Sequence, residues 1–96
     1  MDCAEVVKRL QQQRGKLTTL GVTSLMLFGS VARGAARPES DVDLLVEFSG
    51  PVTFDRYIRL KDFLEGVLGH PVDLLTRKGI RPQLLPHIEQ DAAHVA

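Results

Sequence analysis

Apolar and polar positions along the chain follow two periods, one typical of helices and one typical of strands. Apolar side chains recur every three or four residues in the helical segments, and they alternate or form short runs in the strand segments. This pattern predicts secondary structure for most of the chain. Helical spacing occurs in residues 3–20 and 53–68, and strand patterns occur in residues 23–28, 41–48 and 72–76.

Glycine and proline mark where predicted elements end. Gly21 follows the first helix, and Gly29 ends the first strand and precedes a short helix. Beyond Gly79 we expect a final short helix, which Pro86 should kink or split because proline removes a backbone donor. The element order predicts a single α/β (α+β) domain over residues 1–96, with a small mixed β-sheet and helices packed on one face.

Composition narrows the class of protein without choosing a function. The 96 residues are 44% hydrophobic and 25% charged, which is the balance of an ordinary globular domain. Twelve basic residues offset twelve acidic ones, so the chain lacks the broad positive charge typical of nucleic-acid binders. The single cysteine, Cys3, cannot form an intramolecular disulfide, and no apolar run is long enough to span a membrane. We therefore expect a cytoplasmic protein.

Two aspartates stand out in the strand predicted for residues 41–48. Asp41 and Asp43 are two positions apart, so both side chains point to one face, roughly 6.6 Å apart along the strand. Two carboxylates on one face repel each other, and a divalent cation that prefers oxygen ligands relieves the repulsion. Paired metal ions about 3.5–4 Å apart clamp both oxygens of a phosphoryl displacement. The pair therefore predicts a metal-dependent phosphoryl-transfer site.

A glycine and a serine follow the first predicted strand. Gly29 lets the backbone approach a ligand closely, and backbone donors at the start of the next short helix can hold a phosphate. The hydroxyl of Ser30 adds a donor, and Arg33, one turn further on, can reach the same phosphates. These three residues are the predicted nucleotide-binding group.

A third carboxylate is expected from a neighbouring strand. Asp73 stands between Val72 and Leu74 and points to the face opposite both, and an unpaired charge buried there would be costly without a role. Glu47 is the alternative, because it shares a face with Asp43. It lies about 13 Å further along the strand, which is too far to share a metal without a bend. The sequence therefore favours Asp73.

Each feature has an ordinary explanation when taken alone. An isolated Asp-x-Asp pair seldom binds metal, and Asp41 after Ser40 suits a turn. A glycine-serine pair after a strand is usually a turn, Asp73 suits a solvent-facing strand edge, and Arg33 suits an exposed surface. The joint arrangement of strand, Gly-Ser, connection, diacid strand and third acid is what favours catalysis.

Two competing phosphate and metal motifs fail on the same residues. A phosphate-binding P-loop over Gly29 and Gly34 would need lysine and serine or threonine where Ala35 and Ala36 stand. An EF-hand loop starting at Asp41 would need a polar residue and a glycine where leucine and valine follow. The aromatic and histidine residues are interpreted as structural: Phe54, Tyr57 and Phe63 as helix core rather than a base-stacking platform, and His70, His87 and His94 as surface residues.

The motif spacing resembles the DNA polymerase β-type nucleotidyltransferase superfamily, and within it the minimal nucleotidyltransferases. Their signature is an apolar strand ending in Phe-Gly-Ser, ten intervening residues and Asp-x-Asp. Here Ser30 is followed by residues 31–40 and then by Asp41-Val42-Asp43. The resemblance covers nearly the whole chain. One departure is Val31, where many relatives carry a basic residue.

The resemblance implies transfer of a nucleoside monophosphate, AMP from ATP, to a hydroxyl, with Mg²⁺ and release of pyrophosphate. Asp41 and Asp43 would hold two metal ions, and Asp73 would complete the metal site and help to deprotonate the attacking hydroxyl. Gly29 and Ser30 would grip the triphosphate. Such transfer depends mainly on positioning and charge neutralisation.

The resemblance also implies a partner. The printed chain ends soon after Asp73, so we expect the acceptor to be a separate macromolecule. Minimal members of the family are commonly paired with a HEPN-domain RNase toxin, to which they add AMP as antitoxin. Two alternatives stay open: a non-catalytic module that neutralises a partner by occlusion, and a small-molecule nucleotidyltransferase with its acceptor pocket at a homodimer interface.

Overall fold

The computed structural model describes residues 2–35, 37 and 40–96, without the side chain of Asp91. The ten-residue connection between the two sequence motifs therefore lies partly outside the described residues. Helices and strands follow each other in the order α1 (Cys3–Gln11), α2 (Arg14–Thr19), β1 (Val22–Phe28), α3 (Gly29–Ala32), β2 (Val42–Phe48), α4 (Phe54–Leu68), β3 (Val72–Thr76), η1 (Arg77–Gly79), η2 (Pro82–Leu84), α5 (Leu85–Asp91) and β4 (Ala93–His94), where η marks a 3-10 helix.

The strands form one mixed sheet in the order β3-β2-β1-β4. Strand β1 runs antiparallel to β2 and β4, whereas β2 and β3 are parallel and are joined through α4. Parallel neighbours need such a crossover, because a short turn cannot return the chain to the same end. The prediction of a small mixed sheet is confirmed.

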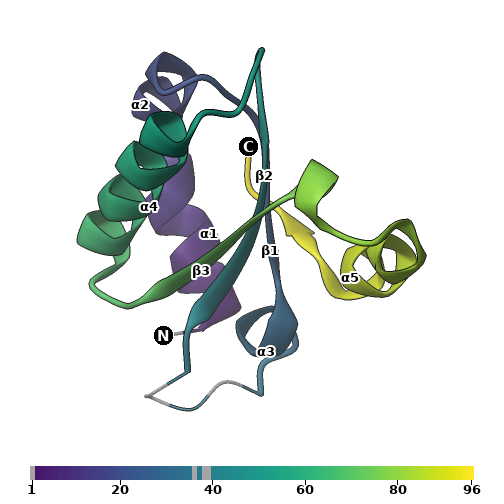
Figure 1. Cartoon of the computed structure of the whole chain (residues 1–96). Coiled ribbons are helices and arrows are strands. Elements are labelled where there is room, and N and C mark those ends of the chain that lie inside the picture. Colours follow the sequence, from purple (N-terminus) through teal and green to yellow (C-terminus); the bar gives the residue numbers. More distant parts are fainter. Residues whose placement is uncertain (1, 36, 38–39) are drawn as a thin grey trace.

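The two faces of the sheet are covered differently (Figure 1). Helices α1, α2 and α4 lie on one side, and α3 and α5 lie on the other. The first side holds the main core, where leucines of α4 pack against alternate residues of the strands. The prediction that helices pack on one face only is therefore incomplete. Leu45 points to the second side and is 2% exposed, so that side is also covered. The fully buried residues include Leu25, Leu27, Leu44, Val46, Leu60 and Leu64.

The first predicted helix is two helices. Helix α1 ends at Gln11, α2 begins at Arg14, and Gln13 between them leaves helical geometry with φ −103° and ψ 18°. After buried Leu10, the positions one turn further along are polar, so no core contact stabilises a continuous helix there. Leu17 restores the burial in α2, and Gly21 ends the segment with a positive φ of 87°.

Helix α4 matches its prediction closely. Thr53 caps its first turn by accepting a hydrogen bond from the backbone of Arg56, and Gly69 closes it in the left-handed conformation. Tyr57 and Phe63 pack against the core as expected. Phe54 does not, because it is 80% exposed at the first helical position, where the chain has only begun to approach the sheet.

The final segment is split, as Pro86 predicted. Residues Pro82–Leu84 form a 3-10 turn, and Pro86 stands in the first turn of α5, where a missing backbone donor costs little. Strand β4 was not predicted. It pairs with β1 through Met26 and Leu27, and the following Val95 is 1% exposed, so this tail packs on the chain's own core.

No helix within the described ranges has the length and apolar character that crossing a bilayer demands.

Candidate active site

The two predicted acid strands lie side by side. In the parallel register of β2 and β3, Asp43 is the direct partner of Asp73. Asp41 immediately precedes β2 and is exposed. All three acids therefore gather where β2 and β3 begin, on the face that carries α3 and α5. The structure brings together the aspartates that the sequence singled out.

The surroundings of Asp43 change the pKa of its carboxyl group. Partial burial raises the pKa of the Asp43 carboxyl above its usual range, and the charge of Asp73 raises that pKa further. The charge of Asp41 acts in the same direction, whereas Arg33 lowers the pKa. A hydrogen bond that the protonated Asp43 donates to the carboxylate of Asp73 also raises this pKa. The negative charges beside Asp43 thus oppose its ionisation, and a cation bound next to its carboxylate would relieve that repulsion.

Gly29 is required by the position of Asp43. Its φ is +74°, a conformation that side chains rarely adopt. A Cβ added there would lie 2.9 Å from Cγ and 3.1 Å from Cβ of Asp43, and it would overlap the carboxylate Oδ2. Phe28, the preceding residue, is the cross-strand partner of Asp43 in β1. The bare glycine therefore lets the turn after β1 lie directly against the acid.

Ser30 and Arg33 occupy the turn that follows. Ser30 is half-buried in α3, and its carbonyl accepts a hydrogen bond from the backbone of Ala35 at 2.9 Å. Val31, the position that departs from the family pattern, is 3% exposed and holds α3 in the core. Arg33 is exposed at the end of α3, and its charge acts on Asp43. The predicted nucleotide-binding group therefore borders the acids.

Glu47 lies in a different cluster from the acids. It pairs with Arg77 at 2.6 Å, and its place in β2 puts it away from Asp43, so the choice of Asp73 over Glu47 agrees with the geometry. The expectation that Asp73 is buried was wrong, however. Asp73 is exposed rather than buried, and its flanking residues Val72 and Leu74 are the buried ones.

The acids fit a partly formed cation site. Across residues 2–35, 37 and 40–96, no three histidine, cysteine, aspartate or glutamate side chains converge as a complete metal cage. Mg²⁺ does not need one, because it is usually held by one or two carboxylates together with substrate phosphates and water. The adjacent residues Asp43 and Asp73 match that donor set, and the charge of Asp41 acts on Asp43.

Arg77 was not predicted from the sequence as part of this face. The pattern does indicate it, because Asp73, Leu75 and Arg77 alternate along the strand and its continuation, and alternate residues share a face. Arg77 contacts both Glu47 in β2 and Glu89 in α5.

Comparison with known proteins decides the family. The model of the nucleotidyltransferase domain matches residues 3–94. The chain belongs to the nucleotidyltransferase domain family. It is therefore a transferase.

Two relatives show which nucleotidyltransferases are similar. A candidate protein adenylyltransferase of Methanocaldococcus jannaschii is 44% identical over 77 residues, which are 77% of each chain. The protein adenylyltransferase MntA of Thermococcus cleftensis is 33% identical over 75 residues, covering 78% of this chain and 76% of that protein.

Solved structures agree on the fold. The structure of a candidate minimal nucleotidyltransferase matches with a TM-score of 0.84 at 38% identity, over 97% of this chain and 95% of that one. A nucleotidyltransferase fold is also found in the complex of a tri-AMPylated HEPN toxin with its MNT antitoxin from Shewanella oneidensis. That match has a TM-score of 0.60 at 18% identity, over 91% of this chain and 71% of the other, and it bears on the fold alone.

Proposed function

We propose that this nucleotidyltransferase transfers AMP from ATP to a hydroxyl group of a partner protein. The observation that carries the proposal is the in-register pair of Asp43 and Asp73, which borders the Gly29-Ser30 turn. The adenylyl group and the protein acceptor are suggested by relatives named as protein adenylyltransferases. We place this activity in the cytoplasm, where ATP is available and where the single cysteine of the chain is in keeping with a reducing compartment.

Each acid has a distinct task in this proposal. Asp41 and Asp43 would hold two Mg²⁺ ions, and Asp73 would complete the site and accept the proton of the attacking hydroxyl. The hydroxyl oxygen forms a bond to the α-phosphorus of ATP, the bond from that phosphorus to the bridging oxygen breaks, and pyrophosphate leaves. When bound, Mg²⁺ neutralises the negative charge that develops on the phosphate oxygens.

The turn after β1 binds the triphosphate. The glycine lets the backbone of this turn lie directly against Asp43, so a phosphate held by the turn would lie next to that acid. The hydroxyl and backbone of Ser30 donate hydrogen bonds, and Arg33 supplies a positive charge at the exposed end of α3. Orientation of the reacting groups contributes much of the acceleration in such transfers.

The proposed acceptor is a HEPN-type toxin, and the protein would act as its antitoxin. The solved complex with an AMPylated HEPN toxin motivates this choice of partner. The family resemblance implies a tyrosine hydroxyl of the toxin as the acceptor. The open end of the sheet at β2 and β3 leaves the acids exposed enough for a group on another protein to reach them.

The test is transfer of label from α-labelled ATP to a co-expressed HEPN partner. We expect Asp43→Asn to reduce labelling at least about 1,000-fold, because charge neutralisation at the reacting phosphate is lost. Asp62→Asn is the matched control, because Asp62 is an exposed acid on α4 in the opposite layer. It should label the partner like the parent protein.

Three results would reject parts of the proposal. Full labelling by Asp43→Asn would refute the assignment of the acids. If Asp43→Asn still protected cells from the co-expressed HEPN toxin without labelling it, neutralisation by occlusion would be favoured. Labelling of a small molecule but of no protein, together with a dimeric mass in solution, would favour the small-molecule enzyme.

A further inference from the structure

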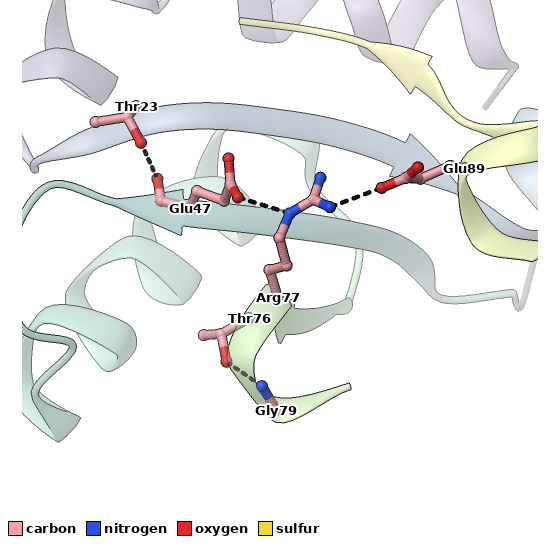
Figure 2. A network of polar contacts seen from close by, with 6 residues as sticks. All are labelled: Thr23, Glu47, Thr76, Arg77, Gly79 and Glu89. Carbon is pink, nitrogen blue, oxygen red and sulfur yellow. Dashed lines mark hydrogen bonds and ion pairs between the residues drawn. The ribbon is translucent and has the colours of Figure 1, made fainter. Parts of the chain in front are cut away.

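Arg77 joins the sheet to α5 (Figure 2). Its Nη1 donates a hydrogen bond to Oε1 of Glu89 at 2.7 Å, and its Nε lies 2.6 Å from Oε1 of Glu47. The Nε–H is not directed at that oxygen, so the contact with Glu47 is an ion pair without a hydrogen bond. The contact with Glu89 combines charge and a directed bond, which makes it the stronger of the two links.

Apolar packing holds α5 only loosely. Leu85 and Ile88 are half-buried, and no side chain described in α5 is fully buried. The helix is also only seven residues long, so it contains few backbone hydrogen bonds of its own. The link between Glu89 and Arg77 is therefore a large part of what fixes α5 over this face of the sheet.

Helix α5 also contacts the proposed nucleotide-binding turn. It packs against both α3 and β1. Helix α3 begins with Gly29 and Ser30, so its position sets where those residues stand relative to Asp43. A four-residue helix cannot hold its own position, and it depends on the elements packed around it.

We propose that Arg77 is a positioning residue for nucleotide binding. Through Glu89 it fixes α5, and α5 in turn supports α3 and the Gly29-Ser30 turn. The inference rests on the proposed function for the role of that turn. Arg77 itself touches neither the acids nor the turn in any contact described above, so it acts through α5.

A surface ion pair with a purely structural role is the rival explanation. The chain offers a matched example in α1, where Arg9 and Glu5 pair at 2.6 Å. The side chains of that pair are 42% and 45% exposed, compared with 34% for Arg77 and 42% for Glu89. The two pairs should therefore cost similar stability when broken.

The experiment compares Glu89→Gln with Glu5→Gln in two readouts. The first is the steady-state KM for ATP and kcat with the HEPN partner. We expect Glu89→Gln to raise KM about threefold to tenfold with little change in kcat, because ATP binding is weakened before chemistry. Glu5→Gln should leave both constants unchanged.

The second readout is amide hydrogen exchange of the free protein, which needs no acceptor and no activity. Glu89→Gln should accelerate exchange at residues 29–34 as well as in α5, and Glu5→Gln should do neither. Faster exchange confined to α5, or equal KM effects of the two variants, would overturn the positioning role. If the parent protein labels no acceptor, the proposed function fails, and the exchange result still decides whether Arg77 supports α3.

Discussion

The two faces of the sheet are built on different principles. On one face, α4 contributes Leu60, Leu64 and Leu68, each 1% exposed or less. On the other face, α5 has no fully buried side chain among those described and is tied to the sheet by Arg77. The packed face is held by buried apolar side chains. The opposite face depends on the positions of charged side chains. Stability thus comes mainly from one face of the strands, and the proposed chemistry belongs to the opposite face.

The largest effect should come from the packed face. Leu64→Ala removes a fully buried side chain of α4 and should lower the free energy of unfolding by about 3 kcal/mol. Ile88→Ala is the matched change in α5, and because Ile88 is half-buried it should cost about 1 kcal/mol. Urea unfolding followed by circular dichroism measures both. Equal losses would remove the contrast between the faces.

The next effect concerns the acid face. Gly29→Ala places a Cβ against Asp43 and should reduce AMP transfer about 100-fold, because the turn and the acid can no longer meet. Gly34→Ala separates this from backbone strain. Gly34 has a similar positive φ of 72°, but a Cβ there meets nothing within 4 Å.

Gly34→Ala should therefore cost about 1 kcal/mol of stability from its backbone conformation alone. Its rate of transfer should stay close to that of the parent protein. If both alanine variants lose transfer equally, backbone strain explains the effect, and the close approach of Gly29 to Asp43 has no catalytic importance.

The smallest expected effect concerns two hydrogen bonds between α4 and edge strand β3. Tyr57 donates a hydrogen bond from its hydroxyl to the carbonyl of Leu74 at 2.7 Å, and Glu65 accepts one from the backbone of Val72. Helix α4 thus satisfies backbone groups of edge strand β3 with its side chains. Tyr57→Phe should lower the free energy of unfolding by about 1 kcal/mol and leave AMP transfer unchanged. A selective loss of transfer, measured at full folding, would contradict this assignment.

Local patterns predicted what depends on neighbours in sequence. The alternation in residues 41–48 put Asp41 and Asp43 on one face, and helical spacing predicted a helix over residues 53–68. The sequence favoured Asp73 as the third acid, but its direct pairing with Asp43 was not predicted, because a strand register depends on residues far apart in the sequence.

Features that depend on distant contacts were missed or misjudged. Strand β4 is two residues long and exists because β1 offers it an edge, so no local pattern indicates it. Phe54 has the right spacing for a core residue but lies before α4 reaches the sheet. Arg77 gains its importance from Glu89, which is 12 positions away in a separate helix.

The register between β2 and β3 couples two properties that are usually adjusted separately. Leu44 pairs with Leu74 on one face, and one position earlier Asp43 pairs with Asp73 on the other. A slip of one residue would turn the acid toward the core and a leucine toward solvent. The mutual repulsion of the acids therefore does not shift the register, because burial of the leucines on the reverse side holds the alignment. A well-packed core therefore also fixes the spacing of the carboxylates.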